Sequence, residues 1–101
     1  VMTSERIPAA PQLPTVAESG VSGFEASGWN GIVAPAGTPQ EIVNRLNRVI
    51  NEVVMQKDVH DRLAKQGVVV DPKTPEAFSL MIKHEIDKWS KLTKDVNIKL
   101  E

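Results

Sequence analysis

The chain contains no cysteine among its 101 residues. This absence excludes disulfide bonds, thiolate metal sites and cysteine nucleophiles. Aromatic residues make up only 4%, and 12 Lys and Arg nearly balance 13 Asp and Glu, for a net charge of −1. A basic stripe or a stacking platform for nucleic acid is therefore not expected. The sequence also has no run of about 18 apolar residues, which a membrane-spanning helix would need.

What remains is the composition of an ordinary small globular domain. Hydrophobic residues make up 41% and charged residues 25%, so disordered and fibrous classes are not indicated. A chain of this length buries only a modest core. It opens on Val1-Met2-Thr3, without an initiator methionine or a signal peptide, which indicates the middle of a longer protein. Leu100-Glu101 fits either the natural chain or a cloning remnant.

Residues 1–28 are rich in Pro, Gly and Ser and give little helix signal. Val1–Thr3 is typical of the end of a strand. Three prolines then enforce an extended path, and Thr15 can cap one short turn that Gly20 ends. A second strand is predicted from Phe24 through residues 29–34, where two glycines suit a bend or a close backbone approach.

From residue 38 onward the pattern becomes helical. Thr38-Pro39-Gln40-Glu41 predicts a capping box, and an apolar face follows it at spacings of three and four, made of Ile42, Leu46, Val49, Ile50 and Val53. Asp58 is expected to cap a second helix that Gly67 ends. Thr74-Pro75 starts a third helix, ending around 92–95, with one face made of Phe78, Met81, Ile82, Ile86 and Trp89.

Between the second and third helices, Val68-Val69-Val70 predicts a short strand. The whole pattern is α/β, with few strands and three helices. So small a sheet gives the helices little to pack against. Either the chain associates with a copy of itself, or it was cut from a larger sheet.

No catalytic or metal site can be assembled from these residues. His60 and His84 lie on different predicted helices without a metal-binding spacing, and Ser19 lacks the strand–turn–helix setting of a nucleophile elbow. The glycines do not follow a phosphate-binding pattern either. We therefore predict a non-enzyme without cofactor or metal, and a small hydrolase is the weakest alternative. Trp29 fits a core anchor or a residue at a cleft equally well.

Several blocks resemble one known family. They are Leu13-Pro-Thr-Val-Ala-Glu-Ser-Gly20, Gly23-Phe24-Glu25, Trp29-Asn-Gly-Ile-Val-Ala-Pro-Ala-Gly-Thr-Pro39, Ile42-Val-Asn-Arg-Leu-Asn47 and Thr74-Pro-Glu-Ala-Phe78. In order and content they resemble the substrate-binding receptors of tripartite tricarboxylate transporters, the Bug-type periplasmic solute-binding proteins. The resemblance implies the C-terminal part of a two-lobed type II periplasmic-binding-protein fold. Residues 1–27 would end the second lobe, 28–37 would form a crossing or hinge strand, and 38–101 would complete the first lobe.

The same resemblance implies a function. The whole protein would capture a small carboxylate or amino-acid ligand in the periplasm and deliver it to the membrane components of the transporter. Ligand-binding or hinge residues in this part of the chain would be Thr3, Ser4, Trp29, Asn30 and Gly31. The alternative is a helical interaction module that self-associates and binds no ligand of its own. Ligand identity stays open, because the loops that select the ligand would precede this segment.

Overall fold

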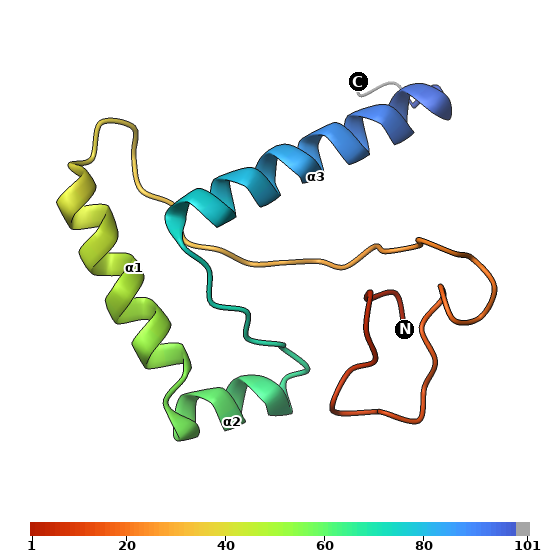
Figure 1. The fold of residues 1–101 in the computed structure, drawn as a ribbon, viewed down its shortest axis with the longest axis horizontal. Helices are drawn as coiled ribbons and strands as arrows, with labels where there is room; N and C mark the ends of the chain where they lie inside the picture. Colours follow the sequence, from red (N-terminus) through yellow and green to blue (C-terminus); the bar gives the residue numbers. More distant parts are fainter. Residues whose placement is uncertain (99–101) are drawn as a thin grey trace.

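The computed structural model describes residues 1–98, so the origin of Leu100-Glu101 lies outside the described residues. Three helices make up the regular structure, α1 at Gln40–Val54, α2 at Lys57–Lys65 and α3 at Pro75–Asp95. Residues 1–39 form an irregular segment that turns back on itself and then runs beside α3 (Figure 1). The three predicted helices are therefore confirmed, and α3 ends where the sequence indicates.

The two Thr-Pro helix starts behave differently. Thr74 Oγ1 accepts a hydrogen bond from Ala77 N at 3.1 Å, so it caps α3 as predicted. The capping box predicted at Thr38 is wrong, because Thr38 Oγ1 donates to Pro35 O at 2.8 Å and the cap position of α1 falls on Pro39. A hydroxyl turned back toward the preceding turn is no longer available to the free N–H groups of the helix.

The second helix also starts without a side-chain cap. Gln56 occupies its N-cap position, and Asp58 lies in the first turn instead of capping the helix. Gly67 ends this helix as predicted, with φ of +77° and a hydrogen bond from Val68 N to Leu63 O at 3.0 Å. A left-handed glycine with this pairing is a common helix C-terminus.

The three predicted strands are not present among residues 1–98. Val16 N donates to Val1 O and Ala26 N donates to Met2 O, each at 2.9 Å, but these are isolated bonds and not a ladder. Val68–Val70 likewise has no strand partner, and Val68 N donates to Leu63 O at the end of α2 instead. A strand exists only where a second strand accepts its hydrogen bonds, and the described chain supplies none. The expectation of a few strands within this segment is therefore wrong.

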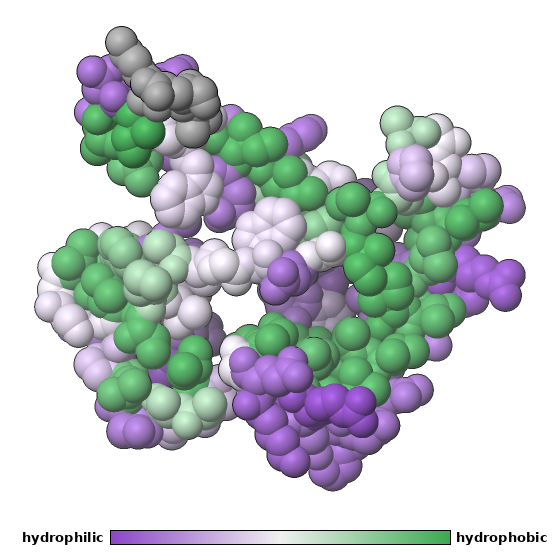
Figure 2. Space-filling view, turned by 180° about the vertical axis from the view of Figure 1, so that it is seen from behind, coloured by the Kyte–Doolittle hydropathy of each residue, from purple (hydrophilic) through white to green (hydrophobic). Residues whose placement is uncertain are grey.

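No hydrophobic residue in the described chain is buried. The predicted apolar face of α1 is largely open to solvent, with exposed fractions of 41–49% for Ile42, Leu46, Val49 and Val53. Figure 2 shows apolar surface gathered on the side of the molecule where α1 lies. The Cα radius of gyration is 16.6 Å, against about 13 Å for a compact domain of 100 residues. The helices form, but most of the apolar face of α1 is left uncovered by the described residues.

Contacts between the helices are few and partly polar. The Nδ2 atoms of Asn47 and Asn51 on α1 both donate to Lys73 O, at 2.8 and 3.1 Å. Lys73 directly precedes the cap of α3, so these bonds hold the start of α3 against the middle of α1. No helix in the described part is long and apolar enough to cross a membrane.

Candidate functional site

Residues 29–31 meet α3 near the start of the helix. The Trp29 ring lies edge-on to the Phe78 ring, with centroids 5.5 Å apart and planes at 90°. Gly31 lies against the same phenyl ring. A Cβ atom at position 31 would lie 3.0 Å from Phe78 Cε2, and closer still to Cζ. The absence of a side chain at Gly31 is therefore what lets the chain approach Phe78.

Two open hollows lie between α3 and the segment that leads to Gly31. One is lined by Gly23, Phe24, Glu25 and Ala26 on the irregular segment and by Lys88, Trp89, Lys91, Leu92 and Asp95 on α3. The other is lined by Trp29, Ile82, Glu85, Ile86, Trp89, Ser90 and Thr93. Their surfaces are mainly apolar. Residues 23–31 thus follow α3 from its C-terminal turns back to its start (Figure 1).

Glu85 is the charged residue that lines the second hollow. Trp89 Nε1 donates to Glu85 Oε2 at 2.8 Å. Lys88 Nζ lies 3.6 Å from Glu85 Oε1 and 5.4 Å from the centre of the Trp89 ring. The indole hydrogen bond, followed by the Lys88 charge, lowers the pKa of Glu85 below its ordinary value. The carboxylate is thus kept ionised and already has two partners.

Thr3 and Ser4 lie on a different part of the irregular segment. Thr3 Oγ1 donates to Glu5 O at 2.6 Å, which closes a local turn. The bond between Ala26 N and Met2 O brings this turn beside the chain that leads to Trp29. In the described part of the molecule, no hydrogen bond joins Thr3 or Ser4 to residues 29–31. The structure therefore gathers Trp29 and Gly31 at Phe78, while Thr3 and Ser4 stay at a separate turn.

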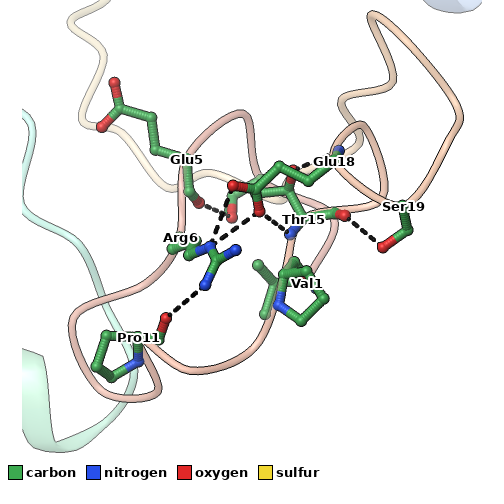
Figure 3. A network of polar contacts seen from close by, with 9 residues as sticks. Val1, Glu5, Arg6, Pro11, Thr15, Glu18 and Ser19 are labelled. Atoms are coloured by element: carbon green, nitrogen blue, oxygen red, sulfur yellow. Dashed lines mark hydrogen bonds and ion pairs between the residues drawn. The ribbon is translucent and has the colours of Figure 1, made fainter.

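A polar network organises residues 1–20 (Figure 3). Thr15 Oγ1 accepts from Glu18 N at 3.0 Å, and Thr15 N donates to Glu18 Oε2 at 2.8 Å. Arg6 Nε donates to both carboxylate oxygens of Glu18, at 2.9 and 3.1 Å, and Arg6 Nη1 donates to Pro11 O. Thr15 is 2% exposed and is the only buried residue in the described chain. The predicted Thr15 cap is confirmed.

Sequence reasoning named Thr15 but missed Glu18 and Arg6. The signal for Glu18 was present, because Thr15-Val-Ala-Glu18 is the Thr-x-x-Glu pattern of a capping box. Arg6 carried no comparable signal, since its pairing spans 12 residues of irregular chain. Its hydrogen bond, followed by that from Thr15 N, lowers the pKa of Glu18. The guanidinium is already paired with a carboxylate, so its role here is to hold the loop.

The family of the chain follows from comparison with known proteins. The model of the tripartite tricarboxylate transporter family receptor, TctC, matches residues 1–98. The chain belongs to this family. The TctC family is a family of transport receptors and not of enzymes. This agrees with the prediction from the sequence that the protein is not an enzyme.

Individual relatives of this TctC chain cover it almost completely. It is 39% identical over 93 residues to the UPF0065 protein in the tcbD-tcbE intergenic region of Pseudomonas sp. (strain P51), covering 91% of this chain and 28% of that protein. It is 36% identical over 101 residues to protein BugT of Bordetella pertussis, covering 100% of this chain and 31% of BugT. The chain therefore spans about three tenths of the length of these relatives.

A solved structure supports the same relationship. R. palustris Rpa4515 with adipate is 33% identical to the TctC chain and superposes with a TM-score of 0.77, over 92% of this chain and 31% of that one. The match covers 31% of the relative, so the superposition describes the fold of this segment and not of the whole relative.

Among residues 1–98, no three His, Asp or Glu side chains gather into a metal-binding group.

Proposed function

We propose that this chain is part of a periplasmic solute-binding receptor that captures a small organic acid for a tripartite carboxylate transporter. The observation that carries the proposal is the agreement of family and fold over nearly the whole chain. The TctC match runs over residues 1–98, and a relative solved with adipate superposes with a TM-score of 0.77. A small carboxylic acid is thus the first ligand class to test.

In this proposal the chain contributes to both sides of a hinged cleft. Residues 1–27 end the second lobe, 28–37 cross between the lobes, and 38–101 belong to the first lobe. Thr3, Ser4, Trp29, Asn30 and Gly31 lie at the cleft or at the crossing. The ligand shifts the population toward the closed state, as in other proteins that close by a hinge. The contact of Trp29 and Gly31 with Phe78 supports a crossing segment that is held on α3.

The test uses the longest natural chain that contains residues 1–101. Thermal unfolding is measured with adipate, citrate, smaller dicarboxylates and amino acids, since a ligand that binds only the folded state raises the Tm by mass action. We expect at least one carboxylic acid to raise the Tm in a concentration-dependent way. A panel without any shift would contradict the proposal.

A substitution then tests the role of the crossing segment. Trp29→Ala should weaken binding of the best acid, or change the closure seen by X-ray scattering with and without that acid. Leu80→Ala is the control, because Leu80 lies on α3 with 66% of its surface exposed. Equal affinity and equal scattering profiles for Trp29→Ala and the parent protein would count against a cleft or hinge role for Trp29.

The exposed helix faces support a second candidate for the 101-residue chain taken alone, self-association. Its accessible surface of 8445 Å² exceeds the roughly 5,700 Å² of a compact protein of this mass. The excess of about 2,700 Å² is more than a standard protein–protein interface buries. A second copy is an occupant that would cover the apolar face of α1. A constant monomer mass at all concentrations in sedimentation would reject this candidate.

A further inference from the structure

Residues 23–31 form an extended segment that follows α3, here named the strap. Its first residues line a hollow with the C-terminal turns of α3, and Trp29 lines a second hollow with the middle of the helix. Of the three glycines in the strap, only Gly31 would place a Cβ atom against a neighbour, the Phe78 ring. The strap is also tied to the start of the chain, because Ala26 N donates to Met2 O at 2.9 Å. Gly31 is thus the place where the backbone of the strap lies close against a side chain of α3.

The contact at Phe78 leaves no room for a side chain on the strap. The ring atoms Cε2 and Cε1 of Phe78 would lie 3.0 and 3.2 Å from a Cβ atom at position 31, and Cζ would lie closer. The centroid of the same ring lies 5.5 Å from the centroid of the Trp29 ring, and the two ring planes are perpendicular. Gly31 has an ordinary φ, so its lack of a side chain serves the close approach and not an unusual backbone conformation.

The backbone that carries Phe78 is fixed by two sets of hydrogen bonds. Phe78 N donates to Thr74 O at 3.0 Å, in the turn that the Thr74 hydroxyl caps. Lys73, one residue before this turn, accepts two hydrogen bonds from asparagines of α1. A continuous series of contacts thus connects α1 to the strap through the first turns of α3.

We propose that Phe78 and Gly31 are positioning residues, which fix the Trp29–Asn30 segment of the receptor relative to the helices. This inference rests on the proposed function, in which that segment lies at the ligand cleft or at the crossing between lobes. A strap held in its bound position before the ligand arrives avoids part of the ordering cost of binding. Neither residue needs to touch the ligand, because the phenyl ring acts through the strap.

Hydrogen exchange measured on peptides tests the positioning directly, in the longest natural chain that contains residues 1–101 and without ligand. Gly31→Ala forces an added methyl group against Phe78, and overpacking of this kind is destabilising. We expect amide exchange to rise about tenfold in the strap peptides that contain Phe24 and Ala26, whose amides donate to Val21 O and Met2 O. Gly28→Ala is the matched control, because a Cβ atom at position 28 meets nothing within 4 Å and its φ is also ordinary.

The double variant separates positioning from general damage. Phe78→Ala alone removes the ring and should also raise exchange in the strap. In Gly31→Ala/Phe78→Ala the added methyl group has room, so the combined effect should be smaller than the product of the two single effects. Independent effects of the two substitutions, or equal exchange in Gly31→Ala and Gly28→Ala, would overturn the inference.

Adipate affinity, measured by calorimetry on the same variants, connects the positioning to binding. We expect Gly31→Ala to weaken adipate binding about tenfold, with part of the loss recovered in Gly31→Ala/Phe78→Ala. Full adipate affinity in Gly31→Ala, despite a loosened strap, would overturn the link to binding. If no carboxylic acid binds the parent protein, the proposed function fails, while the exchange measurements still decide whether Phe78 positions the strap.

Discussion

Glu18 connects three parts of the irregular N-terminal segment through one carboxylate. It accepts hydrogen bonds from Thr15 N and from the Arg6 guanidinium, and Arg6 in turn donates to Pro11 O. Residues 1–20 of this segment contain three prolines and take part in no strand ladder. This side-chain network supplies the fixed points that secondary structure supplies elsewhere.

The lowered pKa of Glu18 gives a direct measurement of this network. In Arg6→Gln the guanidinium, which is the first cause of the shift, is lost, and we expect the pKa of Glu18 to rise toward 4.5. Carboxyl carbon NMR as a function of pH measures the change. The pKa of Glu85 is an internal control, because its main cause is Trp89 on α3. An unchanged pKa of Glu18 would mean that the ion pair does not persist in solution.

The lowered pKa of Glu18 also determines how the stability of this loop changes with pH. A carboxyl group whose pKa is lower in the folded than in the unfolded state stabilises the fold above its unfolded pKa. For Glu18 the contribution is complete above its ordinary value of 4.5 and disappears as the pH falls through the lowered pKa. We expect amide protection factors in the loop of residues 1–20, which compare exchange with that of an unstructured chain at the same pH, to fall over this acidic range, and Glu18→Gln to flatten that dependence.

At the scale of elements, the two Thr-Pro helix starts make a paired test of capping. Thr74 accepts a hydrogen bond from Ala77 N, whereas the hydroxyl of Thr38 donates to Pro35 O. Loss of a true N-cap hydroxyl costs about 1 kcal/mol. We expect Thr74→Ala to lower the free energy of unfolding by about this amount, as measured in urea, and Thr38→Ala to lower it by less. A larger loss for Thr38→Ala would show that the capping box forms in solution.

The same comparison explains which elements the sequence could predict. Helices depend on contacts three and four residues apart, so periodicity and breakers located all three, and the end of α3, to within a few residues. Val68–Val70 has the composition of a strand, but a strand also needs a partner from elsewhere in the chain. The sequence placed Phe78 on one face of its helix. Its contact with Gly31 spans 47 positions, and no local pattern encodes it.

At the scale of the whole molecule, the apolar face of α1 is the main unsatisfied feature. Leu46 lies at its centre and is 49% exposed. Relatives are about three times as long as this chain, so in a longer protein the rest of the fold has the length to cover this face. In the 101-residue chain alone, the proposed self-association would cover this face with a second copy. A polar substitution on this face is therefore expected to lower the stability of the longer protein and to weaken self-association of the 101-residue chain.

Leu46→Gln tests both contexts, with Arg48→Gln as the control at an exposed position of the same helix. Glutamine is a good helix former, so neither change should disturb α1 itself. In the longest natural chain, burial of Leu46 predicts a loss of about 2 kcal/mol in the urea-measured free energy of unfolding for Leu46→Gln, with little change for Arg48→Gln. In the 101-residue chain, self-association predicts that Leu46→Gln lowers the sedimentation mass while Arg48→Gln preserves it. An unchanged stability of the long chain would mean that α1 is open to solvent there too, and would remove the reason for assigning this face to the interior of a lobe.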